Sequence, residues 1–283
     1  MARKLWLPLL IVAILAALAG TAFTTRRGPP AAQDSGITVE FLGWSHYRLT
    51  SATGTVVITN PFITNNPDAA ITVDAAIAHG ADVILVADGH TDELGDAVAI
   101  AKATGAQLLI PFEAGDWLTR RDNIPRAQVP WIVPGDTQRV KGITINALNA
   151  VHGSGMNAGP EAPYAYGGPA FSFMVTFENG FTIYFSGSSA ATMDMAMWGE
   201  WYKPDAAILN ISAFHNPRDA AMVGKLLTTN NPNLKTVFPH HHRVRPQGGG
   251  LFTPSDLQTE LQRLDVTATF IVPNLLEEYH LTK

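Results

Sequence analysis

The chain has 283 residues, enough to bury one large hydrophobic core, and its 46% hydrophobic and 15% charged content is that of an ordinary globular protein. Its net charge of −5, without a cluster of lysine and arginine, argues against a nucleic-acid partner. There are no cysteines, which excludes disulfides, thiolate metal ligands and cysteine nucleophiles. A metal site in this chain would therefore be built from histidine and carboxylate side chains.

Residues 1–23 have the pattern of a targeting segment rather than of a folded element. Arg3 and Lys4 precede an unbroken apolar run from Leu5 to Ala19, and the small residues at its end suit a signal peptidase. Extended to Phe23, the run is also long enough, at about 1.5 Å per residue, to cross a bilayer as an uncleaved anchor. Both alternatives predict an exported protein, periplasmic or secreted, that meets the membrane only through this segment if the segment is retained.

Residues 24–36, rich in proline, glycine and alanine, predict a linker, and residues 37–283 predict one folded domain of alternating strands and helices. The predicted strands are Ile37–Gly43, Ser45–Ser51, Thr55–Asn60, Val83–Ala87, Gln107–Ile110, Val140–Val151, Phe171–Phe177, Phe181–Phe185, Asp205–Ile211, Lys235–Pro239 and Ala268–Val272. The predicted helices are Val73–His79, Gly95–Thr104, Glu113–Arg121, Ala190–Trp201, Pro217–Thr228 and Pro254–Leu264. This order predicts mixed sheets with helices on their outer faces.

The loop after the buried strand Val83–Ala87 carries four metal-ligand side chains within six residues: Asp88, His90, Asp92 and Glu93. Like charges packed this densely repel one another, and a bound cation is the usual way to offset that repulsion. The alternative is an ordinary polar loop in which Asp92 or Glu93 lies favourably against the dipole of the following helix.

Two more places put histidines just past a strand: His152 and the triplet His240–His242. Loops at the carboxyl ends of strands converge in α/β sheets, so these histidines are candidates to join the acidic loop. Consecutive residues of an extended chain point in opposite directions, so at most two of the triplet can face one site.

These residues resemble the metallo-β-lactamase superfamily, and within it the L-ascorbate-6-phosphate lactonase-like branch of small metal-dependent hydrolases. The resemblance covers most of residues 37–245 and rests on ITVEFLGWSHYRL, the strand ends TNPF and AVHGSG, ADVILVADGHTDELGDAVAIAKATGA, IYFSGSS and VFPHHH. It implies an α/β (α+β) fold, the four-layer αββα sandwich of that superfamily.

The resemblance also implies a set of metal ligands. The superfamily's His-x-His-x-Asp-His motif, its third histidine and its last histidine fall on Asp88, His90, Asp92, Glu93, His152 and His241. The chain departs from the pattern at four positions: both outer histidines of the motif are acidic, the bridging aspartate is Ser188, and the Asp-Pro pair after the third strand is Asn60-Pro61.

Carboxylates in place of histidines harden the expected site but keep it competent to bind a divalent ion, with manganese, iron or zinc as candidates. One ion is expected between Asp88, His90 and His152. A second is expected between Asp92, Glu93 and His241, although losing the bridging aspartate to Ser188 favours a one-metal site.

The resemblance predicts a hydrolase that attacks a lactone, ester or phosphoester of a small-molecule substrate with a metal-bound hydroxide. Asp92 would orient the attacking water or act as its base, Ser188 would hydrogen-bond it, and Trp44, Tyr164 and Tyr166 would line the pocket. The alternative is a catalytically inactive member that binds a ligand or a partner at the membrane. A Ser-His-Asp hydrolase is disfavoured, because no Gly-x-Ser-x-Gly elbow surrounds Ser188 or Ser189.

Overall fold

The structure is a computed structural model that describes residues 36–157, 159, 164–212, 216–244 and 252–283. Two sheets dominate the described part, with a two-stranded ribbon beside them. The first sheet has the order β15 (Glu278–Leu281), β1 (Ile37–Gly43), β2 (His46–Thr50), β3 (Val56–Thr59), β4 (Val83–Leu85) and β5 (Gln107–Leu109). The second has the order β14 (Thr269–Phe270), β13 (Thr236–His240), β12 (Ala206–Asn210), β11 (Thr182–Phe185), β10 (Phe171–Thr176), β7 (Ile143–Asn149) and β6 (Thr137–Val140).

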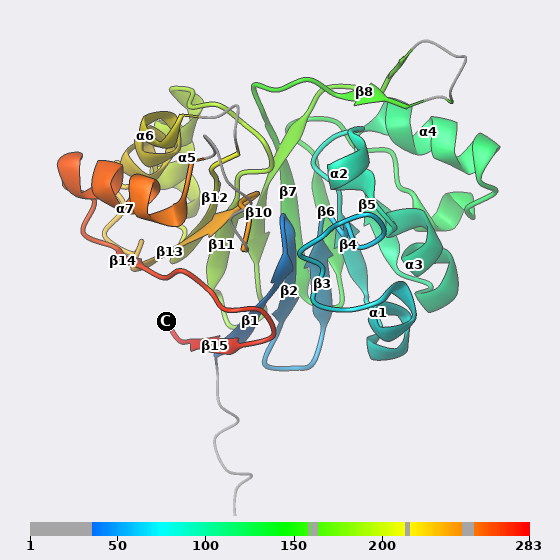
Figure 1. Ribbon diagram of the computed structural model, residues 1–283, viewed down its shortest axis with the longest axis horizontal. Helices are drawn as coiled ribbons and strands as arrows, with labels where there is room; N and C mark the ends of the chain where they lie inside the picture. The colour runs from blue at the N-terminus through cyan, green and yellow to red at the C-terminus, as the bar shows by residue number, and fades with distance from the viewer. Residues whose placement is uncertain (1–35, 158, 160–163, 213–215, 245–251) are drawn as a thin grey trace, which may run out of the picture. The chain divides into compact units, whose positions relative to one another are not determined.

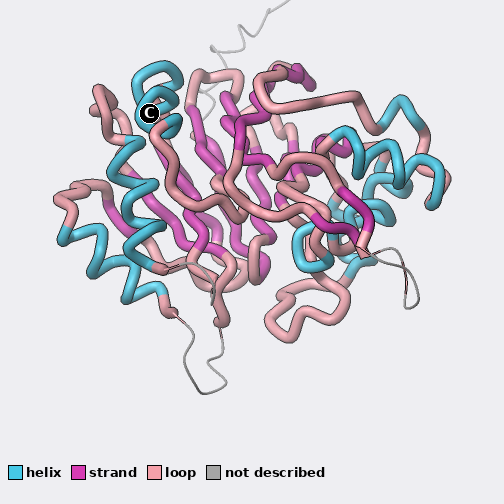
Figure 2. Tube along the Cα trace, turned by 90° about the horizontal axis from the view of Figure 1, so that it is seen from above, coloured by secondary structure: helices cyan, strands magenta, loops and turns pink. Residues whose placement is uncertain are grey.

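Helices cover the outer face of each sheet, as Figures 1 and 2 show. The first sheet is covered by α1 (Val73–His79), α2 (Thr91–Leu94), α3 (Ala97–Thr104) and α4 (Phe112–Arg121), with a 3-10 turn at Arg126–Gln128. The second is covered by α5 (Asp194–Tyr202), α6 (Pro217–Leu227) and α7 (Pro254–Arg263). The predicted four-layer αββα sandwich is thus confirmed.

Three apolar clusters separate these layers. The central one lies between the two sheets and is rich in aromatic side chains such as Phe41, Phe171 and Phe238. The outer two join each sheet to its own helices. Because β4 and its neighbours are buried on both faces, their sequences are continuous apolar runs rather than alternating ones.

Several predicted boundaries are wrong for identifiable reasons. The helix expected over Gly95–Thr104 begins only at Ala97 and is preceded by the separate short helix α2, since Gly95 has a φ of +44° and an added Cβ would lie 2.4 Å from the Pro61 carbonyl oxygen. The helix expected from Ala190 begins only at Asp194, because Ala190 pairs with Val151 in a β-bridge.

Two pieces of structure were not expected from the sequence. The loop Gly153–Gly168 contains a short antiparallel ribbon of β8 (Gly155–Met156) and β9 (Ala165–Tyr166). The last strand, β15, pairs antiparallel with β1, and Ile37 lies opposite Leu281. None of the helices in the described residues is long and apolar enough to cross a membrane. The predicted targeting segment and all of the predicted linker except Gly36 lie outside those residues.

The strands β1, β3 and β4 run in the same direction, because β1 and β3 are each antiparallel to β2 while β3 and β4 are parallel. Their carboxyl ends therefore meet at one edge of the sheet. The segments that follow them, at Trp44, Asn60 and Asp88, reach the same region of the molecule.

We predict that Gly187 is needed to bring the β11 end close to β10 and β4. It has a φ of +50°, and an added Cβ would lie 2.5 Å from the Phe171 carbonyl oxygen and 2.6 Å from Ala87 Cβ. Gly187→Ala should therefore lower the free energy of unfolding by about 3 kcal/mol, combining left-handed strain with overpacking. Urea denaturation of purified protein measures this loss.

Gly54→Ala is the matched control, because Gly54 also has a positive φ, +88°, but has open space around an added Cβ. It should lose only about 1 kcal/mol, the cost of the backbone conformation alone. Equal losses in the two variants would contradict the steric explanation.

Candidate metal centre

The loop after β4 is held in place by hydrogen bonds from its own backbone. The Gly89 amide donates to Ser154 Oγ at 3.1 Å, and the His90 amide donates to Asp88 Oδ1 at 2.9 Å. His90 is the N-cap residue of the short helix α2, so Asp92 and Glu93 occupy the first turn of that helix. The backbone therefore fixes the positions of Asp88, His90, Asp92 and Glu93 relative to one another.

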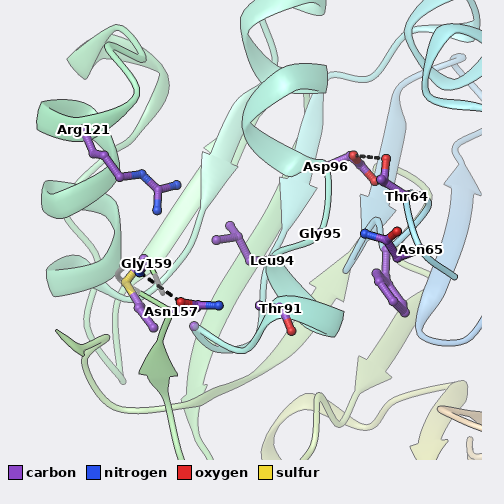
Figure 3. Close-up of a pocket in the computed structure, with 12 residues that line it drawn as sticks. Thr64, Asn65, Thr91, Leu94, Gly95, Asp96, Arg121, Asn157 and Gly159 are labelled. Carbon is purple, nitrogen blue, oxygen red and sulfur yellow. Dashed lines mark hydrogen bonds between the residues drawn. The ribbon is translucent and has the colours of Figure 1, made fainter. Parts of the chain in front are cut away.

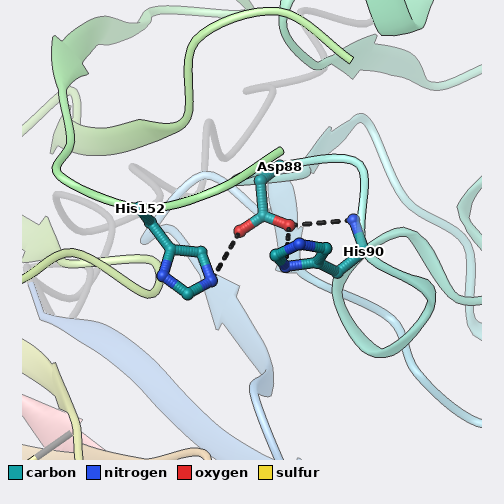
Figure 4. A group of neighbouring side chains, drawn as sticks. All are labelled: Asp88, His90 and His152. Carbon is teal, nitrogen blue, oxygen red and sulfur yellow. Dashed lines mark hydrogen bonds and ion pairs between the residues drawn. The ribbon is translucent and has the colours of Figure 1, made fainter. Parts of the chain in front are cut away.

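Asp88, His90 and His152 form the first cluster, shown in Figure 4. Each residue offers one ligand atom, and these atoms lie within 4.8 Å of one another. His90 Nδ1 is 3.1 Å from Asp88 Oδ1, and His152 Nε2 is 3.9 Å from Asp88 Oδ2. The two imidazole rings meet edge to face at 5.1 Å between centroids. The structure thus brings together three side chains that come from two distant loops.

The burial of Asp88 tests whether a cation fits this cluster. The Asp88 side chain has no exposed surface, and its Oδ2 has no hydrogen-bond partner among the described residues. Burying a carboxylate with an unsatisfied oxygen costs several kcal/mol (roughly 3–5 for an uncompensated buried charge). A divalent ion among the three side chains would supply the missing partner. The residues present therefore fit such an ion.

The two histidines of this cluster have opposite pKa shifts. The hydrogen bond to Asp88 is the main reason why the pKa of His90 is raised. Burial is the main reason why the pKa of His152 is lowered, which favours the neutral imidazole that ligates metals. A cation at this cluster would compete with protonation of the His90 imidazole.

Asp92, Glu93 and His241 form a second cluster beside the first. His241 Nε2 lies 3.1 Å from Asp92 Oδ2 and 3.4 Å from Glu93 Oε1. The Trp44 indole N–H donates to the same Asp92 oxygen at 3.1 Å. Burial opposes ionisation of Asp92, but the hydrogen bonds from His241 and Trp44 outweigh it and lower the pKa of Asp92 to about 2.

Glu93 is the most enclosed member of this cluster. Ser188 Oγ donates to its Oε1 at 2.6 Å, and the Asn60 side-chain amide donates to its Oε2. Asn60 Oδ1 in turn accepts from the Ala87 amide at 2.9 Å, so this residue joins the ends of β3 and β4. Burial, followed by the charges of Asp88 and Asp92, raises the pKa of Glu93 well above its usual range.

Three residues around the second cluster have positive backbone φ angles although they are not glycine. They are Trp44 (+60°), Asn60 (+35°) and His241 (+62°). Trp44 and His241 support each other, because the His241 amide donates to the Trp44 carbonyl at 2.9 Å and their rings lie 4.4 Å apart. Such strain is uncommon for bulky residues and tends to gather at functional sites.

The other histidines serve the fold rather than the two clusters. His240 is buried, lies 3.1 Å from Ser186 Oγ through its Nε2, and packs on Phe185. His242 stacks on Phe41, and burial lowers its pKa to about 4. Only His241 of the triplet reaches Asp92 and Glu93, which agrees with the expected limit of two, although the φ of +62° at His241 means that the chain is not extended there. His215 lies outside the described residues.

A pocket of about 670 Å³ lies beside the first cluster (Figure 3). It is bounded by the end of α4 at Arg121, the start of α3 at Asp96 and the β8 segment at Asn157. It touches the metal loop only at Gly89 and Thr91, so it neighbours the clusters without containing their side chains.

The three aromatic residues expected at the pocket do not line it. Tyr164 and Tyr166 are 74% and 71% exposed, and Trp44 binds Asp92 instead. The side chains of Asn60, Trp44 and Ser154 all hydrogen-bond the metal loop, and none of them had a predicted role in holding it. The periodicity of the sequence gives no signal for such contacts. The one sequence feature that points to them is Asn60, which precedes a proline at the end of a strand.

The four-layer fold and the cluster of Asp88, His90 and His152 are those of a metal-dependent hydrolase of the metallo-β-lactamase fold. Residues 55–243 match the family model described as Beta-lactamase superfamily domain, and the chain belongs to this family. Two relatives are named UPF0173 metal-dependent hydrolase. The one from Myxococcus xanthus is 33% identical over 248 residues, covering 86% of this chain and 84% of the relative. The one from Rubrobacter xylanophilus is 30% identical over 234 residues, covering 81% and 90%.

A solved structure supports the fold. Igni18, a metallo hydrolase from the hyperthermophilic archaeon Ignicoccus hospitalis, superposes with a TM-score of 0.72 at 21% identity, covering 88% of this chain and 99% of Igni18. The predicted superfamily, metal dependence and enzymatic class are therefore confirmed. The comparisons do not distinguish the lactonase-like branch within that superfamily.

We predict that the buried His46 makes the fold sensitive to acid. Burial and the nearby Arg48 charge lower its pKa from 6.5 to about 3, and neither ring nitrogen has a hydrogen-bond partner among the described residues. Between pH 6.5 and pH 3 the unfolded chain binds a proton at this residue that the folded chain does not. Its contribution to stability is therefore lost as the pH falls, by about 1.4 kcal/mol per pH unit.

His46→Leu removes this ionisable group and needs no hydrogen bond. The variant should show a shallower loss of unfolding free energy between pH 6.5 and pH 4.5, measured by urea denaturation with chelator present. The difference at pH 8, where His46 is neutral in both states, gives the separate effect on packing. Parallel pH profiles would contradict the prediction.

Proposed function

We propose that this metal-dependent hydrolase cleaves a lactone, ester or phosphoester of a small-molecule substrate. The proposal has Asp88, His90 and His152 hold a divalent ion, with manganese, iron or zinc as candidates. One observation carries it: the fully buried Asp88 carboxylate has an oxygen, Oδ2, without a hydrogen-bond partner among the described residues, and the imidazoles of His90 and His152 flank this carboxylate. Two imidazoles and one carboxylate form a donor set that suits all three metals.

The first cluster (Asp88, His90 and His152), called the triad from here on, would owe its chemistry to the ion. When bound, the ion lowers the pKa of a water and polarises a carbonyl or phosphoryl oxygen of the substrate. Asp92 supports this chemistry as a fixed anion beside the triad. With a pKa of about 2 it is a weak base, so the proposal gives it the role of orienting the attacking water through a hydrogen bond. Trp44 and His241 hold its carboxylate in that orientation.

Ser188 acts in this proposal through Glu93. Its hydroxyl donates a hydrogen bond to Glu93, and the residue is almost fully buried. Both facts disfavour a role as nucleophile. Its predicted hydrogen bond to the attacking water remains a prediction.

Loss of the Asp88 charge tests the proposed function. Asp88→Asn keeps the size of the side chain but removes the anionic ligand, so kcat/KM should fall by more than about 100-fold, since even residues outside the ligand set cost 10–100-fold. The assay uses aryl acetates, aryl phosphates and simple lactones with added manganese, iron or zinc. Asp265→Asn is the control, because it makes the same change at an exposed position after α7.

Two results would count against this function. Retained turnover in Asp88→Asn would show that the triad is not the reacting centre. Metal binding by the wild-type chain without turnover of any of the three substrate classes would favour the alternative of a catalytically inactive binding module.

We also propose that residues 1–23 export the chain, with the segment either cleaved or retained as an anchor. The support is the charge of Arg3 and Lys4 before the apolar run and the small residues at its end. Expressed in a bacterium, the full chain should appear in the periplasm with a new N-terminus after Ala19 or Ala22, or intact in the membrane fraction. N-terminal sequencing of each fraction decides between these. An intact chain in the cytosol would contradict export.

A further inference from the structure

We propose that the centre is built for one ion: the cluster of Asp88, His90 and His152 binds it, while Asp92, Glu93 and His241 form a metal-free cluster closed by protein hydrogen-bond donors. This inference rests on the proposed function, because it assigns the metal of that function to one cluster only.

The hydrogen bonds to Asp92 carry the first step. A carboxylate oxygen has two lone-pair directions. Asp92 Oδ2 faces two nitrogens, the Trp44 indole N–H at 3.1 Å and His241 Nε2 at 3.1 Å. Both directions of the oxygen that faces His241 are therefore used within the protein. A cation could bind this oxygen only by displacing one of the two.

Glu93 is closed in the same way. Its Oε1 accepts from Ser188 Oγ at 2.6 Å and faces His241 Nε2 at 3.4 Å, while its Oε2 accepts from the Asn60 amide. The carboxylate is buried, so water cannot replace a donor that a metal pushes aside. Displacing a donor would leave its polar group unsatisfied in the interior, which costs about 1–3 kcal/mol for each group.

Asp88 has the opposite arrangement. Its Oδ1 accepts from the His90 amide and lies beside His90 Nδ1, but its Oδ2 has no hydrogen-bond partner among the described residues. The imidazole that faces Oδ2 is that of His152, whose Nε2 lies 3.9 Å away, beyond hydrogen-bond distance. Protein hydrogen-bond donors therefore satisfy the carboxylates of Asp92 and Glu93, whereas Asp88 Oδ2 is left for a cation.

Three of the residues that donate hydrogen bonds to Asp92 and Glu93 have strained backbone conformations. Trp44, Asn60 and His241 all have positive φ angles. Left-handed conformations cost about 1–3 kcal/mol each in such residues and persist only where the surrounding structure enforces them. Here the strain places an indole N–H, an amide and an imidazole against two carboxylates, which is the arrangement a permanent hydrogen-bonded cluster requires.

The first cluster alone supplies a complete set of protein ligands for a single ion. Two imidazoles and a carboxylate with open positions form the protein ligand set of mononuclear zinc hydrolases and of mononuclear non-haem iron sites. The second cluster then has a positioning role. Asp92 and Glu93 form the first turn of α2, and His90 is its N-cap residue, so fixing that turn also fixes His90.

The experiment counts ions in the full-length chain. The protein is purified without chelator, loaded with excess manganese, desalted, and measured by mass spectrometry of metals and by electron paramagnetic resonance. We expect about one equivalent, with the six-line signal of an isolated Mn²⁺ centre. Two equivalents with an exchange-coupled signal would overturn the inference and leave the proposed function intact. No bound metal would instead contradict the proposed function itself.

Two isosteric variants assign the ion to its cluster. Asp88→Asn should weaken manganese binding more than tenfold, whereas Glu93→Gln should keep one equivalent with an affinity within a few-fold of wild type, because Gln accepts from Asn60 and can donate to Ser188. Circular dichroism checks that each variant folds. A folded Glu93→Gln that loses its metal would overturn the inference. If that variant does not fold, the wild-type count and signal still decide.

Discussion

The centre depends on the burial of one carboxylate. Asp88 follows β4, a strand enclosed on both faces, and its side chain has no exposed surface. An ionised group in such a position needs compensation that the solvent cannot give. The backbone amide of His90 satisfies one oxygen, and the imidazoles of His90 and His152 approach both. The chemistry of the site follows from how the remaining oxygen is satisfied.

The acidic replacements in the metal motif have different consequences at its two ends. At the first position Asp88 keeps one oxygen without a hydrogen-bond partner among the described residues, on the side of His152, so the change preserves a ligand. At the last position Glu93 is surrounded by Ser188 and Asn60, two donors where the superfamily pattern has acidic side chains. The three substitutions at 60, 93 and 188 are therefore best understood together, because each donor is matched to the carboxylate it contacts.

Much of the fold could be predicted from the sequence, because the central strands are apolar runs and most helices have one apolar face. The misplaced boundaries arise from contacts distant in sequence: Gly95 bends against Pro61, and Ala190 pairs with Val151. The strand β15 was missed since its four residues alternate between exposed and half-buried and gain their partner only from β1. Nothing in local pattern marks such a strand.

The candidate site was less predictable than the fold. The residues that gather at strand ends were identified because they are the right chemical types at the right positions. Their division into two clusters also followed the expected sets, but the donors around Glu93 and Asp92 did not follow from pattern. Positive φ at Trp44 and His241 is a property of the three-dimensional loop, and the indole of Trp44 looks like a pocket residue until its hydrogen bond to Asp92 is known.

The pairing of β1 with β15 places the first and the last strand of the described domain side by side. Ile37 begins β1 opposite Leu281, whereas the other end of β1 leads to Trp44 and the second cluster. Both the first and the last strand of the domain therefore leave it at the end remote from the metal centre. The two chain ends of the described domain therefore share one side, and changes to the sequence at either of them are separated from the metal centre by the length of β1.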